Sequence, residues 1–480
     1  MTEPKVTRQV LPVYTLTEIC SKNDEGAVKR IISAKSASHT EYYYRTVKLS
    51  ESDLFGINQM EMVLDPDGSP WAEACLYIFS RVEDSYDHKG VISASNIASG
   101  LTVFRQYLIE YGVDYLEFPR NKQQRPTYRY RSYLKSLIRS GQIAKSTGQR
   151  FMQSVIGFYK WLYTERGFSP EYPMWKEEDK YIDFKDSHGF SKVKQVKSTN
   201  LSIPSYKETS PDDFTINDGG KLKPLTMDEQ LDLIKVLFKL DNFEMTMIHL
   251  IALFTGARIQ TVLTLKVRHF RVEIPDNLPE IRLPCGPGTG IDTKHDKKLT
   301  IFIPRWLHDR LSIYVNSGRA LRRRLKSDRG DTEENYIFLS NRGAPFYEDS
   351  IDRDTFDPNQ TKKYRASGGT VRTFIAERVL PELRKKHGNS FSYQFHDLRA
   401  SFGMNLSDSF TESVTKGEMT LTKARNRVKE LMGHSSFSTT DEYLGYRDKT
   451  HTARLTQERY QKHLAELMSA AHKGFEQAYD

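Results

Sequence analysis

A chain of 480 residues is longer than one ordinary domain, and we expect two or three. Hydrophobic residues make up 38% and aromatic residues 11%, which excludes a globally disordered chain. The net charge is +9, and the three cysteines form neither a CxxC pair nor a metal-ligand spacing, so we expect no disulfide, no structural zinc and no metal. No apolar run reaches the roughly 20 residues of a membrane span and no signal core opens the chain, which predicts a cytoplasmic protein with no membrane association.

The first 166 residues divide into two regions. Residues 1–70 mix short apolar pieces with charges and are predicted to be an N-terminal extension of unknown role. Residues 71–166 carry apolar positions at helical spacing. One predicted helix ends near Gly112 and Pro119, and a second begins at a Ser146–Thr147 cap. The positions that define the two helices are Ile97, Leu101, Phe104, Leu108, and then Phe151, Val155, Phe158 and Leu162.

The second of these regions is strongly basic. Between residues 118 and 164 there are ten basic residues and no carboxylate, and tyrosines lie among them. Such a surface suits a phosphate backbone, although a solvated basic face is the alternative. We therefore predict a helical DNA-binding domain over residues 71–166. Its predicted DNA contacts are Arg129, Arg131, Lys135, Arg139, Lys145 and Arg150.

Residues 167–221 are rich in proline, serine and glycine, lack periodicity, and are predicted to be a linker without regular elements. A new domain, residues 222–480, opens with a capping box formed by Thr226 and Glu229. The first helix of this domain is expected to bury Leu231, Ile234, Leu237 and Phe238. A second helix buries Met247, Leu250, Ile251 and Phe254, and it ends at Gly256.

The rest of this domain mixes short strands with helices. Strands are predicted at Ile281–Leu283, Leu299–Ile303 and Tyr336–Leu339, and a basic helical face at Arg319–Arg329. The glycine-rich loop after Cys285 lacks the GK[ST] of a P-loop and is interpreted as a turn that presents lysines. Further helices are predicted over residues 371–383, 396–406, 423–432 and 452–478. The expected fold class is therefore mainly α with a small β-sheet (α+β).

Three separated segments carry groups that can act on a phosphodiester. They are TGAR at 255–258, HDLR at 396–399 and LMGHSSFSTTDEYLGY at 431–446. Arginines clamp phosphate oxygens, histidines move protons and a tyrosine can attack phosphorus. Each residue alone has an ordinary interpretation: Arg258 a salt bridge, His434 a core histidine, and Tyr443 one of 26 tyrosines with Tyr446 close by.

Together and in this order, the segments resemble the tyrosine recombinase (phage integrase) family. TGARIQTVLTL is similar to the first arginine box, HDLR to the HxxR box and GHSSFSTTDEY to the GH…Y segment, while YIFLSNRGAP resembles a stretch between the hairpin and the HxxR box. The resemblance covers residues 222 to about 460, and the basic helical region is similar to the family's core-binding domain. It implies a C-shaped DNA clamp of a core-binding and a catalytic domain.

The resemblance also implies roles for individual residues. Arg258 and Arg399 would bind the scissile phosphate, Tyr443 would be the nucleophile, and His396 and His434 would support proton transfer. A hairpin lysine would protonate the leaving oxygen, and Lys294 is favoured over Lys297 and Lys298. The family's acid three residues after the first arginine is replaced here by Thr261.

The implied function is site-specific recombination or integration of a mobile element through a 3′-phosphotyrosine, without metal, ATP or any cofactor. Implied partners are double-stranded DNA bound by a homotetramer on two sites and accessory proteins, with the enzyme on nucleoid DNA in the cytoplasm. Three alternatives stay open: a DNA-relaxing enzyme like a type IB topoisomerase, a catalytically silent DNA-binding regulator, and a metal-dependent phosphohydrolase.

Overall fold

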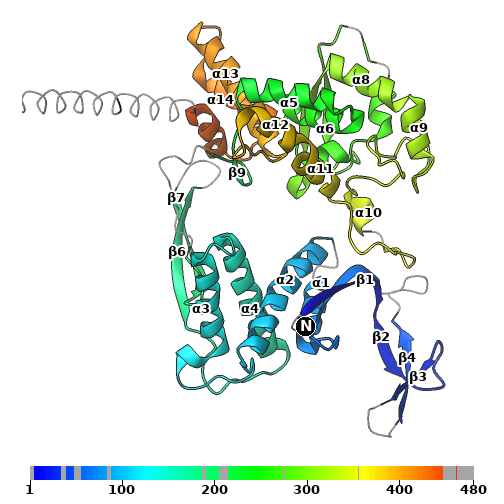
Figure 1. Cartoon of the computed structure of the whole chain (residues 1–480), viewed down its shortest axis with the longest axis vertical. Coiled ribbons are helices and arrows are strands. Elements are labelled where there is room, and N and C mark those ends of the chain that lie inside the picture. Colours follow the sequence, from blue (N-terminus) through cyan, green and yellow to red (C-terminus); the bar gives the residue numbers. More distant parts are fainter. Residues whose placement is uncertain are drawn as a thin grey trace, which may run out of the picture. The chain divides into compact units, whose positions relative to one another are not determined.

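The structure, a computed structural model, describes residues 5–33, 39–47, 56–83, 88–185, 191–204, 215–272, 274–275, 277–354, 356–446 and 461. Within these ranges the chain is mainly helical with small antiparallel sheets, which confirms the predicted fold class (Figure 1). The chain divides into two compact units. Unit 1 comprises Met1–Glu208 and Ser350–Arg365, and unit 2 comprises Thr209–Asp349 and Ala366–Asp480.

The N-terminal part of unit 1 forms two small antiparallel sheets. Strand β1 (Thr7–Thr15) pairs with β5 (Gly56–Leu64), and β4 (His39–Thr46) lies between β2 (Thr17–Cys20) and β3 (Val28–Ser33). Strand β5 is buried along nearly its whole length, because it packs on helices α1 and α2, which follow it in the chain. The sequence indicated no element in this region.

The helices of unit 1 enclose an aromatic core. They are α1 (Ala72–Glu83), α2 (His88–Glu110), a short 3-10 turn η1 (Lys122–Gln124), α3 (Pro126–Arg139) and α4 (Lys145–Glu165). The predicted apolar stripes of α2 and α4 face this core, where Leu101, Phe104, Val155 and Phe158 are fully buried. Helix α4 begins earlier than predicted. Its N-cap is Ala144, without a side-chain cap, so the Ser146–Thr147 cap is wrong.

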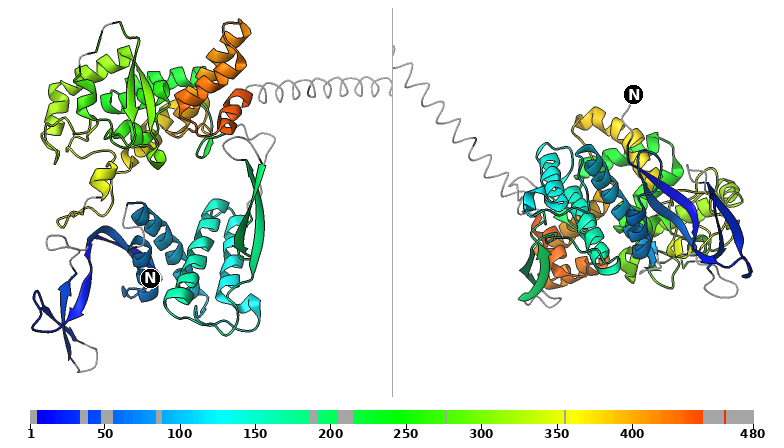
Figure 2. Two further views of the ribbon diagram at one scale, coloured as in Figure 1. Left: turned by 180° about the vertical axis from the view of Figure 1, so that it is seen from behind. Right: turned by 90° about the horizontal axis from the view of Figure 1, so that it is seen from below.

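Two features of unit 1 were not predicted. Strands β6 (Glu177–Lys185) and β7 (Ser191–Thr199) pair over nine residues each, so the stretch read as having no regular elements contains a long two-stranded ribbon (Figure 2). Helix α10 (Ser350–Asp354) and the residues after it also belong to this unit. Asn58 on β5 exchanges two hydrogen bonds with the backbone of Asp357, which ties this segment to the sheet.

Unit 2 begins with a minimal hairpin, β8 (Ile216–Asn217) and β9 (Lys221–Leu222), and continues mainly as helices around one apolar core. Strands β10 (Glu280–Cys285) and β11 (Leu299–Pro304) form its second hairpin, as predicted. The elements between and after them are α5 (Met227–Lys239), α6 (Phe243–Thr255), α7 (Ile259–Leu263), η2 (Val267–Phe270), η3 (Lys294–Asp296), α8 (Arg305–Val315), α9 (Gly318–Arg324), α11 (Gly369–Phe374), the π-helical η4 (Ile375–Val379), α12 (Leu380–His387), α13 (Asp397–Thr415) and α14 (Leu421–Met432).

Helix α5 starts at the predicted capping box of Thr226 and Glu229, but its buried face agrees with the predicted one only in part. Leu233 and Leu237 are buried, whereas Leu231 and Phe238 are exposed. The reason is that the inner face includes Gln230, a polar residue whose amide is satisfied by the Leu225 carbonyl and the Asn405 side chain. A pattern of apolar residues alone does not reveal a buried amide.

Smaller differences concern the edges of unit 2. Phe254 is partly exposed. Residues 336–339 form isolated bridges to Lys266 and Pro345, not a strand. The basic segment after Arg319 is not wholly exposed, because Arg324 is buried against the Val315 carbonyl and Asp331. The helix predicted over 452–478 lies outside the described residues except Gln461.

Candidate active site

Arg258 is placed by a sharp helix end. Helix α6 stops at Gly256, whose φ of 65° is left-handed, and Arg258 is the N-cap of α7. A Cβ on Gly256 would lie 2.5 Å from the Phe402 ring, so glycine is required by both conformation and space. The guanidinium donates from Nη2 to Asp218 Oδ1 at 2.9 Å. Its Nε is buried and has no hydrogen-bond partner among the described residues.

His396 and Arg399 stand at the start of α13. Arg399 is buried and donates to three groups: Asp218 Oδ2 at 2.6 Å, the Gly256 carbonyl at 2.8 Å and the Met432 carbonyl at 2.5 Å. Arg399 therefore joins the β8–β9 hairpin to the ends of α6 and α14. The Nε2 atom of His396 lies 3.0 Å from the Asp218 carbonyl.

His434 and Tyr443 follow α14, which ends at Gly433 with a left-handed φ of 60°, as predicted. The two rings stack at 5.4 Å, and residues 437–446 are helical. The Nδ1 atom of His434 lies 3.0 Å from Thr440 Oγ1, so that Nε2 faces the site. Tyr443 is fully buried against Gly403 of α13, where a Cβ would come within 2.4 Å of its ring.

All five residues meet at Asp218, the first residue of the turn between β8 and β9. Its two carboxylate oxygens lie next to Arg258, Arg399 and His434, and its Oδ2 accepts the Tyr443 hydroxyl at 3.3 Å. The carboxylate is itself only 5% exposed. The structure thus brings together around one residue the five residues that the sequence singled out in three distant segments, four at its carboxylate and His396 at its backbone carbonyl.

Burial and charge set the protonation of this cluster. Burial alone would raise the pKa of Asp218, but His434 and the charges of Arg399 and Arg258 outweigh it and hold that pKa well below its ordinary value. Burial lowers the pKa of both His396 and His434, so both imidazoles are neutral near pH 7. Burial, followed by the charge of Asp218, raises the pKa of Tyr443, whose phenol is therefore protonated.

Two lysines of the β10–β11 connection approach the cluster. Lys294 lies beside the hairpin turn, since a Cβ on Gly219 would come within 2.8 Å of its Nζ, and it lines a cavity of about 570 Å³ with Arg258 and His396. Lys297 donates from Nζ to the Gly433 carbonyl at 2.5 Å. Burial and the two arginines lower the pKa of Lys297. Lys298 is exposed.

The predicted DNA-binding residues lie in unit 1, apart from this cluster in the chain. Arg131, Lys135 and Arg139 are spaced four apart on α3, so they share one face of the helix. Arg131 donates to the carbonyls of Leu201 and Ser202, which gives it a structural bond within unit 1. Arg129 and Lys145 are partly buried on α3 and α4.

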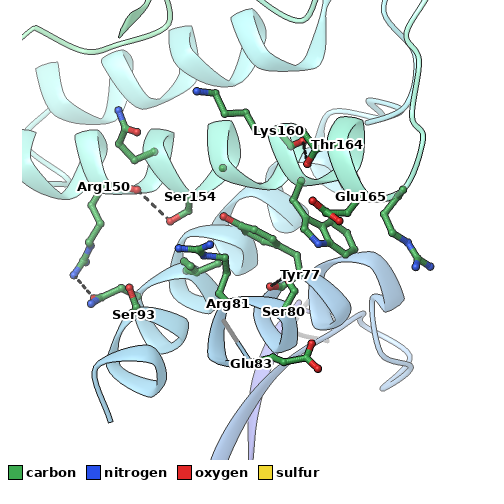
Figure 3. A pocket seen from close by; sticks show the side chains of 16 residues that line it. Tyr77, Ser80, Arg81, Glu83, Ser93, Arg150, Ser154, Lys160, Thr164 and Glu165 are labelled. Atoms are coloured by element: carbon green, nitrogen blue, oxygen red, sulfur yellow. Dashed lines mark hydrogen bonds between the residues drawn. The ribbon is translucent and has the colours of Figure 1, made fainter. Parts of the chain in front are cut away.

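Arg150 lines a polar hollow of unit 1, a cavity of about 830 Å³ bounded by α1, α2 and α4 (Figure 3). Its guanidinium donates to Asn96 at 3.0 Å. The lining also carries Arg81, Lys160 and Arg166 beside the acids Glu83 and Glu165. The cavity therefore combines positive and negative side chains.

Two residues of the cluster, Asp218 and Thr440, were not predicted from the sequence. Asp218 contacts groups at least 40 residues away, and no motif marks it beyond the turn-forming NDGG. Thr440 lies within the GH…Y segment but was assigned no role. Lys297 was named as an alternative to Lys294, and its bond to Gly433 and its lowered pKa distinguish it.

Within the described ranges, no three or more His, Cys, Asp or Glu side chains gather as a metal site. Among the helices that the structure describes, none has the length and apolar character needed to cross a membrane.

Comparison with known proteins finds no matching family model and no matching curated protein. Among solved structures, the chain aligns with the Tn1549 transposon integrase in complex with circular intermediate DNA, at 14% identity and a TM-score of 0.42, covering 77% of this chain and 94% of that one. It also aligns with a lambda integrase dimer bound to a COC′ core site, at 15% identity and a TM-score of 0.38, covering 74% and 88%. The chain is thus similar, at low identity and over most of its length, to two DNA integrases.

Proposed function

We propose that this protein is a tyrosine recombinase that cuts and rejoins DNA. The observation that carries the proposal is the convergence of Arg258, Arg399, His434 and Tyr443 on one buried carboxylate, with His396 on the backbone carbonyl of the same residue. Two arginines, two neutral imidazoles and a phenol form a site for a phosphodiester and for the charge that develops when it is attacked.

In the proposed reaction, the Tyr443 oxygen attacks the phosphorus and the bond from phosphorus to the 5′ oxygen breaks. The tyrosine proton passes to a neutral imidazole, and the two arginines stabilise the added negative charge. The product is a 3′-phosphotyrosine, which conserves the energy of the broken bond. Attack by the 5′ hydroxyl of another strand reverses these steps and completes strand exchange without ATP.

A lysine is proposed to protonate the departing 5′ oxygen. The sequence favours Lys294, and its position beside the site supports that role. Lys297 is the stronger candidate on physical grounds. Burial next to two arginines lowers its pKa, which makes its ammonium a better acid at neutral pH.

The remaining elements of the proposal concern the DNA. We propose that the basic helices of unit 1 bind duplex DNA through phosphate contacts, and that both units clamp the duplex as the enzyme acts on a mobile element. Recombination of two sites requires several active sites at once, so a homotetramer on two DNA sites, with accessory proteins, is the expected assembly on nucleoid DNA.

Covalent trapping tests this proposal. The protein is incubated in EDTA with nicked duplexes from the ends of the element that carries its gene, and the products are separated on a denaturing gel. We expect a protein–DNA adduct with the wild-type chain and with Tyr446→Phe, and none with Tyr443→Phe. An adduct that needs a divalent metal, or that persists in Tyr443→Phe, would overturn the proposal. Relaxation of supercoiled plasmid without recombinant products would indicate a topoisomerase.

A further inference from the structure

The anion-binding site proposed for the scissile phosphate is already filled by the protein's own carboxylate. The Oδ1 atom of Asp218 accepts a hydrogen bond from Arg258, and its Oδ2 atom accepts hydrogen bonds from Arg399 and from the Tyr443 hydroxyl. The Nε2 atom of His434 lies 3.4 Å from Oδ2. A carboxylate and a phosphate offer arginine the same arrangement of paired oxygens. The donors that hold Asp218 are therefore the donors that a phosphodiester needs.

Occupation by Asp218 is incompatible with attack on DNA. The Tyr443 side chain is fully buried, and its hydroxyl is engaged by Asp218. A phosphorus atom cannot come within bonding distance of that oxygen while the carboxylate occupies the same donors. Asp218 is also a poor base for the tyrosine proton, because the groups around it lower its pKa.

Besides the bonds that Asp218 makes with Arg258, Arg399 and His396, a very short paired region holds the segment that carries it. Strands β8 and β9 have two residues each, and the turn between them contains Gly219 at a φ of 75°. The apolar anchors are Ile216 and Leu222, which pack with Tyr443 in a small cluster. At the edge of the hairpin, the Asn217 N–H donates to Glu442 Oε2 at 2.7 Å. An element this small can leave its site without unfolding the core of the unit.

We propose that the β8–β9 hairpin is an autoinhibitory latch, in which Asp218 mimics the scissile phosphate and must be displaced before DNA is cut. This inference rests on the proposed function for its biological meaning. The competition between Asp218 and a phosphate concerns only the anion-binding site. The Nε of Arg258, which has no hydrogen-bond partner in the part of the chain that the structure describes, gives an incoming phosphate a donor that Asp218 does not use. The exchange of one anion for another keeps the arginines paired throughout.

Inorganic phosphate is the probe that tests the latch without knowledge of the DNA site. Its affinity is measured by thermal shift and by titration calorimetry, at constant ionic strength set with chloride. Asp218→Asn should bind phosphate at least about tenfold more tightly than the wild type, because the competing state is removed. Asp228→Asn removes the same charge from an exposed position of unit 2 and should bind like the wild type. The gain should vanish in Asp218→Asn combined with Arg258→Gln.

Equal phosphate affinity in the wild type and Asp218→Asn, or a loss of affinity in Asp218→Asn, would refute the latch and assign Asp218 to positioning the arginines. Hydrogen exchange of the wild-type chain gives an answer even if the variant does not fold. Saturating phosphate should speed exchange of residues 216–222, whereas slower or unchanged exchange contradicts displacement. A short DNA duplex should have the same effect. Failure to bind any duplex would contradict the proposed function, while the phosphate titration still decides the latch.

Discussion

The two arginines of the site make different structural contributions, and Arg258→Gln and Arg399→Gln should separate stability from catalysis. The Arg399 side chain is 5% exposed and bonds Asp218 and two carbonyls that end separate helices. Its loss breaks a buried ion pair and leaves two carbonyls unpaired, which should cost unit 2 about 4 kcal/mol of unfolding free energy. The Arg258 side chain is 19% exposed and donates one hydrogen bond among the described residues, so its loss should cost about 1 kcal/mol.

Both changes should lower the rate of covalent DNA cleavage by about 10²–10³-fold, since each removes one donor for the charge on the attacked phosphate. Stability is measured by urea-dependent hydrogen exchange of peptides from α6 and α13, which reports on unit 2 alone. Cleavage is measured by single-turnover trapping well below the unfolding transition. Equal stability losses, or full cleavage by Arg258→Gln, would refute this reasoning.

Three further predictions follow from single contacts. Thr440→Val should slow cleavage about tenfold and shift its pH profile, because His434 loses the partner that fixes its tautomer, and Thr440→Ser should retain activity. Lys297→Ala should lose cleavage of a normal strand but regain cleavage of a 5′-phosphorothiolate strand, because its thiolate leaves without a proton. If the phosphorothiolate rescues only Lys294→Ala, the general acid is Lys294. Burial lowers the pKa of His249 to about 4. The neutral imidazole of His249 contributes its full stabilisation above its unfolded pKa near 6.5. Unit 2 should therefore lose about 3 kcal/mol of unfolding free energy between pH 7 and pH 4, and less in His249→Gln. Urea-dependent hydrogen exchange at the two pH values measures this loss.

The local parts of the site follow from the sequence. Gly256 and Gly433 end helices by adopting left-handed backbone, and the residues just after them reach the site because of those ends. The five predicted residues of the site lie in three segments, two of which are separated by more than a hundred residues. The order of these segments along the chain allowed the resemblance to group them. Their meeting at one point is a property of the fold that spacing alone does not specify.

The parts that the sequence did not reveal depend on long-range polar contacts. Asp218 is one of 62 acidic residues, and only the folded chain sets it among two arginines. Gln230 is buried because a distant carbonyl and Asn405 satisfy it, so the inner face of α5 departs from the apolar pattern. The ribbon of β6 and β7 forms from strands in which charged residues outnumber apolar ones, so no regular alternation of apolar and polar residues marks them.

Identification of the residue that carries the DNA tests the central claim most directly. The adduct trapped in EDTA is digested with nuclease and protease, and the modified peptide is sequenced by mass spectrometry. We predict a 3′-phosphonucleotide on Tyr443, with none on Tyr446. A nucleotide on any other residue, or an adduct with a 5′ phosphate, would contradict the proposed mechanism.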